Sequence, residues 1–270
     1  MSDTTTTAGM VDQLESAGCG PTEDEARFVR AYVAPGPLDP QLLARTKNPA
    51  VLAARATREA ALRERDWPNL GQYRDANQML AGCTQKAVFI GDSLTEFWLA
   101  ADPEMFGNGL VSGGIVNRGI SGQTSPQILL RFMSDVIALK PAAVHLLCGG
   151  NDLAGNTGPT TFADYQNNIV AMVTLAQAYG VRVILAGITP AGGFAWRPGI
   201  DPRARIARIN AWLKTLAAEH ELVFADYHTA LATPDGALRA ELTRDGVHPT
   251  GAGYAVMRPI ALAALAAALQ

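Results

Sequence analysis

From residue 86 onward, short apolar runs alternate with segments of helical periodicity, and this alternation constrains the fold more than any other feature. The apolar runs predict strands at residues 87–90, 114–117, 143–148, 181–187 and 222–226. The segments between and after them predict helices at residues 126–139, 162–179, 202–220 and 251–269. Elements in this order are joined by right-handed crossovers, so we expect an α/β domain with one parallel sheet covered on both faces.

The composition supplies enough apolar material for a large core. Of 270 residues, 48% are hydrophobic and 17% are charged, which excludes a disordered or collagen-like chain. The formal net charge of −3 provides no basic field, so we expect no nucleic-acid partner. The three cysteines, Cys19, Cys83 and Cys148, match neither a disulfide scaffold nor a zinc motif. We therefore expect no metal and no other cofactor.

Two observations bear on location. The most apolar stretch, residues 260–269, has about half of the roughly 20 residues that a membrane-spanning helix needs, so we expect no membrane span. Residues 1–9 lack the basic and apolar regions of a secretory signal. The sequence thus predicts a cytoplasmic protein, or a periplasmic or secreted one if a leader has been removed.

Residues 1–85 form an N-terminal arm whose composition and residue pattern differ from those of the domain at residues 86–270. We expect the first ten residues to be disordered. Residues 41–65 are rich in Ala, Leu, Arg and Glu and predict one exposed amphipathic helix, and residues 69–80 predict a second, short helix. Because the arm contains no catalytic motif, we interpret it as a packing arm or a contact in a homo-oligomer.

The loops that follow the predicted strands hold the candidate chemistry, because ligands of such sheets bind at the carboxyl ends of the strands. Residues 91–94 read Gly-Asp-Ser-Leu and join the first strand to a helix. A serine on this turn, Ser93, would present its hydroxyl near a helix N-terminus that favours developing negative charge. The alternative is that Asp92 or Ser93 only caps the helix. The G-x-S-x-G elbow of other serine hydrolases is absent.

A histidine could activate this serine by taking its proton, and a carboxylate would orient the histidine. Asp245 and His248 lie three residues apart, just before the last helix, and are the candidate pair. His228 is a rival base. We expect His145 to be a core residue of its strand and His220 to end a helix.

Two further loops could stabilise an oxyanion. Asn151 follows the third strand and could offer a side-chain amide, while Gly119 follows the second strand and could offer a backbone amide. A plain turn capped by Asn151 and Asp152 is the alternative. Cys148 precedes the Gly-Gly pair, and we expect it in the core rather than as a nucleophile.

Taken together, these four blocks resemble the SGNH (GDSL) hydrolase family over residues 86–268. The resemblance implies a three-layer α/β/α sandwich around a five-stranded parallel sheet, a flavodoxin-like arrangement. It also implies that Ser93 is the nucleophile, His248 the general base and Asp245 its orienting acid. The implied oxyanion hole consists of the Ser93 backbone amide, Gly119 and Asn151.

From this resemblance we expect a serine esterase that hydrolyses short acyl esters, acetyl above all, of carbohydrates or other small alcohols. Candidate substrate-binding residues are Asp92, together with Trp196 and Arg197 of the Gly- and Pro-rich loop at residues 190–199, although that loop could equally be a plain surface loop. Alternatives are a lysophospholipase or acyl-CoA thioesterase acting on longer chains, an acetyltransferase, and a non-catalytic ligand-binding member. A metal site formed by Asp92, Asp152, Asp245 and His248 is a further alternative that the sequence does not favour.

Overall fold

The sheet is formed by five parallel strands in the order β2-β1-β3-β4-β5. The computed structural model describes residues 19–107 and 114–270, so the expected disorder of the first ten residues lies outside the described residues. The strands are β1 (Gln85–Gly91), β2 (Ile115–Gly119), β3 (Pro141–Leu147), β4 (Arg182–Ala186) and β5 (Val223–Ala225). The predicted parallel sheet is confirmed, and its order is that of the flavodoxin-like doubly wound fold.

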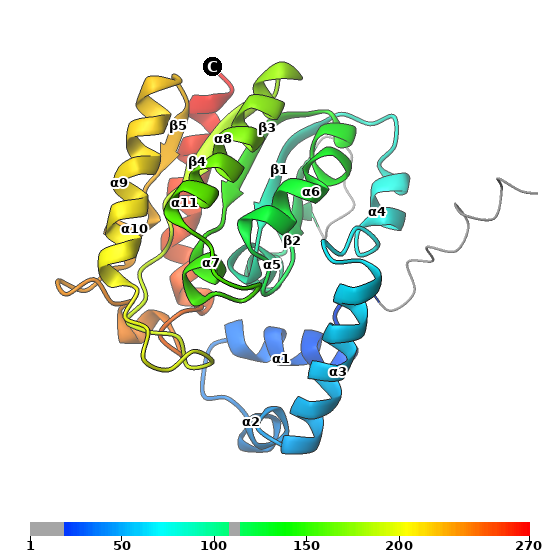
Figure 1. Ribbon diagram of the computed structural model, residues 1–270, viewed down its shortest axis with the longest axis vertical. Helices are drawn as coiled ribbons and strands as arrows, with labels where there is room; N and C mark the ends of the chain where they lie inside the picture. The colour runs from blue at the N-terminus through cyan, green and yellow to red at the C-terminus, as the bar shows by residue number, and fades with distance from the viewer. Residues whose placement is uncertain (1–18, 108–113) are drawn as a thin grey trace, which may run out of the picture.

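Helices cover both faces of this sheet, which gives the expected three layers (Figure 1). One face is covered by α6 (Ser125–Asp135), α8 (Phe162–Ala178) and α9 (Arg203–Glu219). The other face is covered by α5 (Ser93–Ala101), α10 (Tyr227–Leu231) and α11 (Gly251–Ala268). Short helical turns complete the domain: η3 (Ile137–Leu139), α7 (Gly150–Ala154) and η4 (Ala240–Leu242).

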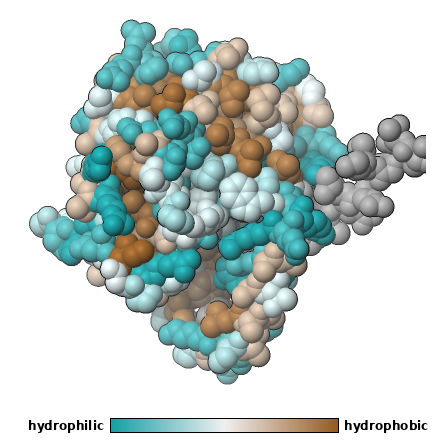
Figure 2. Space-filling model, viewed as in Figure 1, coloured by the Kyte–Doolittle hydropathy of each residue, from teal (hydrophilic) through white to brown (hydrophobic). Residues whose placement is uncertain are grey.

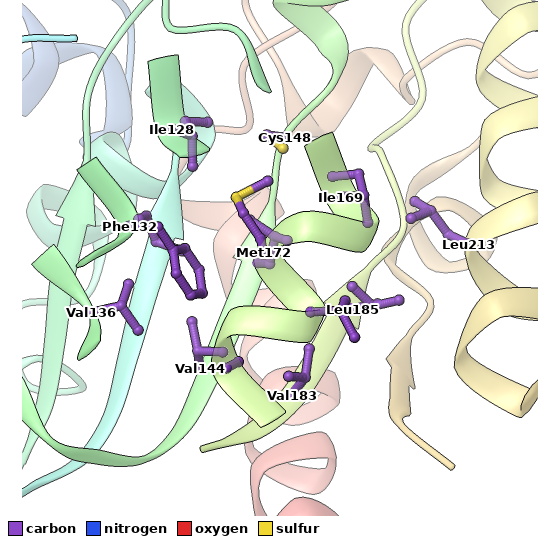
Figure 3. Close-up of a cluster of buried hydrophobic side chains, with 14 of the residues drawn as sticks. Ile128, Phe132, Val136, Val144, Cys148, Ile169, Met172, Val183, Leu185 and Leu213 are labelled. Atoms are coloured by element: carbon purple, nitrogen blue, oxygen red, sulfur yellow. The ribbon is translucent and has the colours of Figure 1, made fainter. Parts of the chain in front are cut away.

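The core on the α6 side is built by the pleat of the strands. Val144 of β3 and Val183 and Leu185 of β4 point toward the same face and are buried. Figure 3 shows Phe132 of α6 and Met172 of α8 packed against them. Burying an aliphatic or aromatic side chain of this size contributes about 1.5–3 kcal/mol, so this layer fixes the sheet on which the strand-end loops are mounted.

Helix α11 covers the opposite face and is more apolar over its length than the sequence analysis recognised. Its 18 residues have a mean hydropathy of 1.4, so among the described residues this helix is long and apolar enough to cross a membrane. The expectation counted only residues 260–269 and was wrong on this point. In the fold, Tyr254 and Met257 of this helix are buried in the core cluster on this face of the sheet. Arg258 forms an ion pair with Asp102 at 3.3 Å.

The arm contains α1 (Glu23–Val33), α2 (Pro40–Thr46), α3 (Pro49–Arg65) and α4 (Arg74–Met79). Two helices, α2 and α3, replace the single helix predicted over residues 41–65, so that prediction is wrong. The chain breaks between them because Pro49 lacks an amide hydrogen and Asn48 caps a new helix by accepting a hydrogen bond from Ala50 N at 2.9 Å. Helix α3 buries no residue, and Figure 2 shows this part of the arm projecting below the body of the protein. In contrast, α1 buries Tyr32 and Val33 in the core cluster on the α11 side.

Candidate active site

The candidate residues gather at the carboxyl ends of the strands, beside the point where the strand order reverses between β1 and β3. Ser93 is the first residue of α5, directly after β1, and is 8% exposed. Asp92 caps the helix by accepting from Leu94 N at 3.0 Å. The cap and the serine role are therefore compatible: Asp92 ends the turn, and Ser93 is free to point its hydroxyl over the sheet edge.

The structure brings Ser93, His248 and Asp245 into one hydrogen-bonded row. Ser93 Oγ lies 2.9 Å from His248 Nε2, and His248 Nδ1 lies 2.7 Å from Asp245 Oδ2. With its proton on Nδ1, the imidazole donates to the carboxylate and leaves Nε2 as the acceptor for the serine hydroxyl. Such a row can take a proton from Ser93 as its oxygen attacks a carbonyl carbon.

Asp245 is held in its ionised form. Burial opposes the charge, but hydrogen bonds from the ring and backbone N–H of His248 and from the Val247 N–H outweigh it. The pKa of Asp245 is therefore well below its usual range. A carboxylate that stays charged can orient the imidazole and stabilise it when it takes a proton.

Aromatic rings surround the imidazole of His248. The Phe97 ring stacks on it with centroids 5.0 Å apart, and the Tyr32 ring meets it edge-on at 6.2 Å. The Trp196 ring lies 6.2 Å away on the 190–199 loop. These contacts restrict rotation of the histidine ring, which preserves its alignment between Ser93 and Asp245.

Asn151 lies on α7, immediately after β3, and its side chain is buried beside Ser93's helix cap. Its Nδ2 donates to Asp92 Oδ2 at 3.2 Å and to the Gln123 carbonyl at 3.0 Å, while its Oδ1 accepts from Asn156 Nδ2 at 2.7 Å. Burial raises the pKa of Asp92 to about 7. Asp92 is 2% exposed and bonded to α5 and Asn151, so the expected contact between Asp92 and substrate is not supported.

Gly119 is placed differently from the expectation. It ends β2, and its N–H donates to Asn117 Oδ1 at 2.9 Å, so this amide is not available to an oxyanion. The next glycine, Gly122, has φ +79° and lies in the loop that Asn156 joins to Asn151, with Asn156 Nδ2 donating to Gly122 O at 3.3 Å. Within the described residues, the Gly122 N–H donates to no protein acceptor. The loop therefore offers a free amide three residues beyond the expected one.

The comparisons with known proteins agree with this geometry. The profile of the GDSL-like lipase/acylhydrolase family matches residues 89–256. The chain belongs to this family. Its members hydrolyse carboxylic esters, so this GDSL-family chain is an esterase of the acylhydrolase type.

Individual relatives support the same assignment. A GDSL-like lipase from Bacteroides thetaiotaomicron is 37% identical with a TM-score of 0.71, over 76% of this chain and 100% of that one. Esterase TesA of Pseudomonas aeruginosa is 27% identical over 63% of this chain and 88% of its own length. The isoamyl acetate-hydrolyzing esterase of Saccharomyces cerevisiae is 26% identical over 64% of this chain and 82% of its own.

Trp196 and Arg197, the two loop residues expected to bind substrate in this GDSL-family chain, differ in whether they border the site. Trp196 is 40% exposed beside His248, and its Nε1 donates to Asn156 Oδ1 at 3.0 Å, so its ring borders the site. Arg197 instead donates to the Ala154 carbonyl at 3.2 Å and fastens the loop to α7. A neighbouring depression of about 690 Å³ lies between this loop and Asp245, and Ser93 does not line it.

The rival residues lie elsewhere. His145 is fully buried and bonds Tyr227 Oη at 2.8 Å, and burial lowers its pKa to about 3, as expected of a core residue. His220 caps the end of α9, and His248 rather than His228 contacts Ser93. Burial raises the pKa of the Cys148 thiol, which disfavours the thiolate. Within the described residues, no group of three or more His, Cys, Asp or Glu side chains could hold a metal ion.

Two features of this GDSL-family site were missed by the sequence analysis. The first is Gly122, which a search for glycines in strand-end loops finds together with Gly119 but cannot rank above it. The second is Tyr32 of α1, whose hydroxyl donates to the His248 carbonyl at 2.9 Å. Helix α1 does have a sequence signal, because Thr22 and Glu25 form a capping box.

Proposed function

We propose that this chain is a serine esterase that hydrolyses short acyl esters, acetyl above all, of carbohydrates or other small alcohols through an acyl-enzyme. The observation that carries the mechanism is the row in which Ser93 Oγ, His248 and Asp245 are joined at 2.9 Å and 2.7 Å. The acetyl preference is supported by the relative whose name describes it as hydrolysing isoamyl acetate, an ester of a small alcohol.

In the first half-reaction, Ser93 Oγ attacks the ester carbonyl while His248 Nε2 takes the hydroxyl proton. The tetrahedral intermediate collapses, His248 gives its proton to the leaving alcohol, and the acyl group stays on Ser93. In the second half-reaction, His248 takes a proton from water, the hydroxide attacks the acyl carbon, and Ser93 regains its proton as the acid leaves. Asp245 remains charged throughout and stabilises the imidazolium.

The oxyanion would be held by three donors. The Ser93 N–H, at the start of α5, and the Gly122 N–H have no protein acceptor in the part of the chain that the structure describes. The third donor is Asn151 Nδ2, whose 3.2 Å bond to Asp92 is long and can be exchanged for a bond to the oxyanion. We assign the backbone position to Gly122 in place of Gly119.

The alcohol side of the substrate would meet Trp196. Its exposed ring beside His248 offers a flat apolar surface on which a sugar ring can stack. A Trp196→Ala variant should raise KM for an acetylated sugar while changing p-nitrophenyl acetate hydrolysis little. Equal effects on both substrates would contradict a role for Trp196 in binding the alcohol.

The test is hydrolysis of p-nitrophenyl esters with acyl chains of about two to twelve carbons, with wild type, Ser93→Ala and the control Ser134→Ala compared. Ser134 bonds a backbone carbonyl of α6 and has no contact with His248. We expect acetate to be the best substrate and Ser93→Ala to lose at least about 1000-fold in kcat. A maximum at long chains would instead support the lysophospholipase or thioesterase alternative, and an active Ser93→Ala would overturn the mechanism.

A further inference from the structure

Helix α1 lies outside the segment matched by the family profile, residues 89–256, yet it reaches the catalytic row. Figure 1 shows α1 below the sheet, on the same side as the loop that leads into α11. Its residues Tyr32 and Val33 are 3% and 5% exposed, and the Tyr32 ring lies 6.1 Å from that of Phe97 of α5. The arm thus packs within its own chain against the part of the domain that carries the proposed chemistry.

The contact centres on the hydroxyl of Tyr32. It donates to the backbone carbonyl of His248 at 2.9 Å and accepts from Arg244 N at 3.1 Å. One side chain of α1 therefore bonds the backbone on both sides of Asp245. The Tyr32 ring also borders the imidazole edge-on, next to the stacked Phe97.

Arg244 returns the contact from the loop to the arm. Its Nε donates to the Tyr32 carbonyl at 2.8 Å, and its Nη2 donates to the carbonyls of Ala34 at 2.8 Å and Gly36 at 2.6 Å. The carbonyls of Tyr32 and Ala34 are acceptors that the end of α1 leaves without helical partners, and Gly36 lies just beyond the helix. The guanidinium and the phenol thus form a reciprocal clasp between the arm and the loop, named here the Tyr32–Arg244 clasp.

The start of α11 fits closely against the same segment. A Cβ on Gly251 would lie 2.6 Å from the carbonyl oxygen of Val33, so only glycine allows this approach. The arm consequently contacts residues before and after His248, at Arg244 and at Gly251. Between these points the chain forms no helix or longer strand, only the isolated bridge between Thr243 and Pro249. The loop is held by the buried side chain of Val247 and by Thr243, whose hydroxyl also donates to the His248 carbonyl at 2.7 Å, and the contacts from the arm add to these.

We propose that Tyr32 is a positioning residue of the hydrolase, and that the Tyr32–Arg244 clasp holds the loop so that His248 stays aligned between Ser93 Oγ and Asp245. This inference rests on the proposed esterase mechanism. Because the Tyr32 side chain is buried and its hydroxyl bonds the loop, at the His248 carbonyl, the Arg244 N–H and the Thr243 hydroxyl, it acts through His248 and not on substrate. The arm therefore contributes to the active site by supporting the position of His248.

The experiment compares wild type with Tyr32→Phe and with a matched control, Tyr227→Phe, in hydrolysis of p-nitrophenyl acetate. Tyr227 also has a buried, hydrogen-bonded hydroxyl, but it bonds His145 in the core and not the catalytic loop. Both variants should lower the thermal unfolding temperature. Only Tyr32→Phe should lower kcat, by about tenfold at unchanged KM, since the hydroxyl's two hydrogen bonds to the loop backbone, at His248 and Arg244, are lost.

The pH profile supplies a readout that a merely structural role would not change. A loosened loop weakens the hold of Asp245 on protonated His248, so the acid limb of kcat/KM should move to lower pH in Tyr32→Phe and stay in place in Tyr227→Phe. Arg244→Lys should shift the profile in the same direction, because the compact ammonium group cannot reproduce the span of the guanidinium, which donates to the carbonyls of the arm from both Nε and Nη2. If Tyr32→Phe misfolds, Arg244→Lys carries the test.

The outcomes separate this inference from the proposed function. If Ser93→Ala is inactive while Tyr32→Phe and Arg244→Lys keep the wild-type kcat and pH profile, the positioning role is overturned and the esterase mechanism stands. If Tyr227→Phe loses kcat to the same extent as Tyr32→Phe, the effect is one of stability and the inference also fails. An active Ser93→Ala would overturn the mechanism itself.

Discussion

Replacing Asp245 with asparagine tests the electrostatics of the proposed catalytic row directly. In Asp245→Asn the side-chain oxygen can still accept from the backbone N–H of Val247 and His248, as Asp245 Oδ1 does at 2.9 Å and 2.8 Å. The amide nitrogen of the asparagine, however, takes the place of Oδ2, the oxygen that in the wild type lies 2.7 Å from His248 Nδ1. Two donors then face each other unless the imidazole moves its proton to Nε2, where it can no longer accept from Ser93.

The expected fall in kcat of Asp245→Asn follows from these contacts. Losing a charge-assisted hydrogen bond costs about 1.5–3 kcal/mol, and the wrong tautomer adds to that loss. Because the Asp245 side chain is 35% exposed, water screens part of the effect. A total of about 4 kcal/mol corresponds to roughly a 1000-fold fall in kcat. KM should change little, since Asp245 contacts the histidine and the loop backbone rather than the proposed substrate position.

The assay is steady-state hydrolysis of p-nitrophenyl acetate, with the thermal unfolding temperature measured alongside. Asp226→Asn is the matched control, because Asp226 also accepts a backbone N–H, from Thr229 at 3.0 Å, but at the start of α10. We expect the control to keep wild-type kcat. A folded Asp245→Asn enzyme that loses less than about tenfold in kcat would refute the tautomer argument.

Three further predictions concern the same site. Asn151→Ala should lower kcat by about 100-fold through loss of an oxyanion donor, and steady-state kinetics with unchanged kcat would contradict that role. The rate should fall on the acid side as His248 takes a proton, so a flat pH–rate profile down to about pH 4 would exclude a histidine base. Asp92 has a pKa raised from 3.8 to about 7, so the folded state holds an extra proton between these values and stability should fall as pH rises through that window. Chemical denaturation across that window should show that Asp92→Asn flattens this fall, and an unchanged slope in Asp92→Asn would contradict the assignment to Asp92.

The sheet could be predicted from sequence because its three central strands, β1, β3 and β4, are buried on both faces over most of their length. Such strands appear as continuous apolar runs, and the predicted run at residues 143–148 overlaps β3, Pro141–Leu147, almost completely. The arm was harder, since α3 buries no residue and its helical pattern has no apolar face to define its limits. There, the local rule that proline begins helices decides the structure, and Pro49 separates α2 from α3.

The site was predictable where a residue type and a strand end determine the chemistry, as they do for Ser93, Asn151 and His248. The site was not predictable where a hydrogen bond within the protein decides which of two backbone amides is available. Gly119 ends β2 and Gly122 lies three residues later, and only the structure shows that Asn117 Oδ1 accepts a hydrogen bond from the Gly119 N–H. Likewise, no local pattern connects Tyr32 with a backbone carbonyl 216 residues away.

The position of His248 explains why a contact from outside the family segment would matter. Ser93 and Asn151 begin or lie in helices that follow β1 and β3, so the central sheet fixes both of them. His248 lies on a loop between η4 and α11 and must still hold its Nε2 within 2.9 Å of Ser93 Oγ. General-base catalysis requires that distance to persist, and misplacement of about 1 Å can cost 100-fold in rate. His248 is thus held by the bonds of its loop rather than by the central sheet, and the Tyr32 hydroxyl is one of those bonds, beside the Thr243 hydroxyl that donates to the same carbonyl at 2.7 Å.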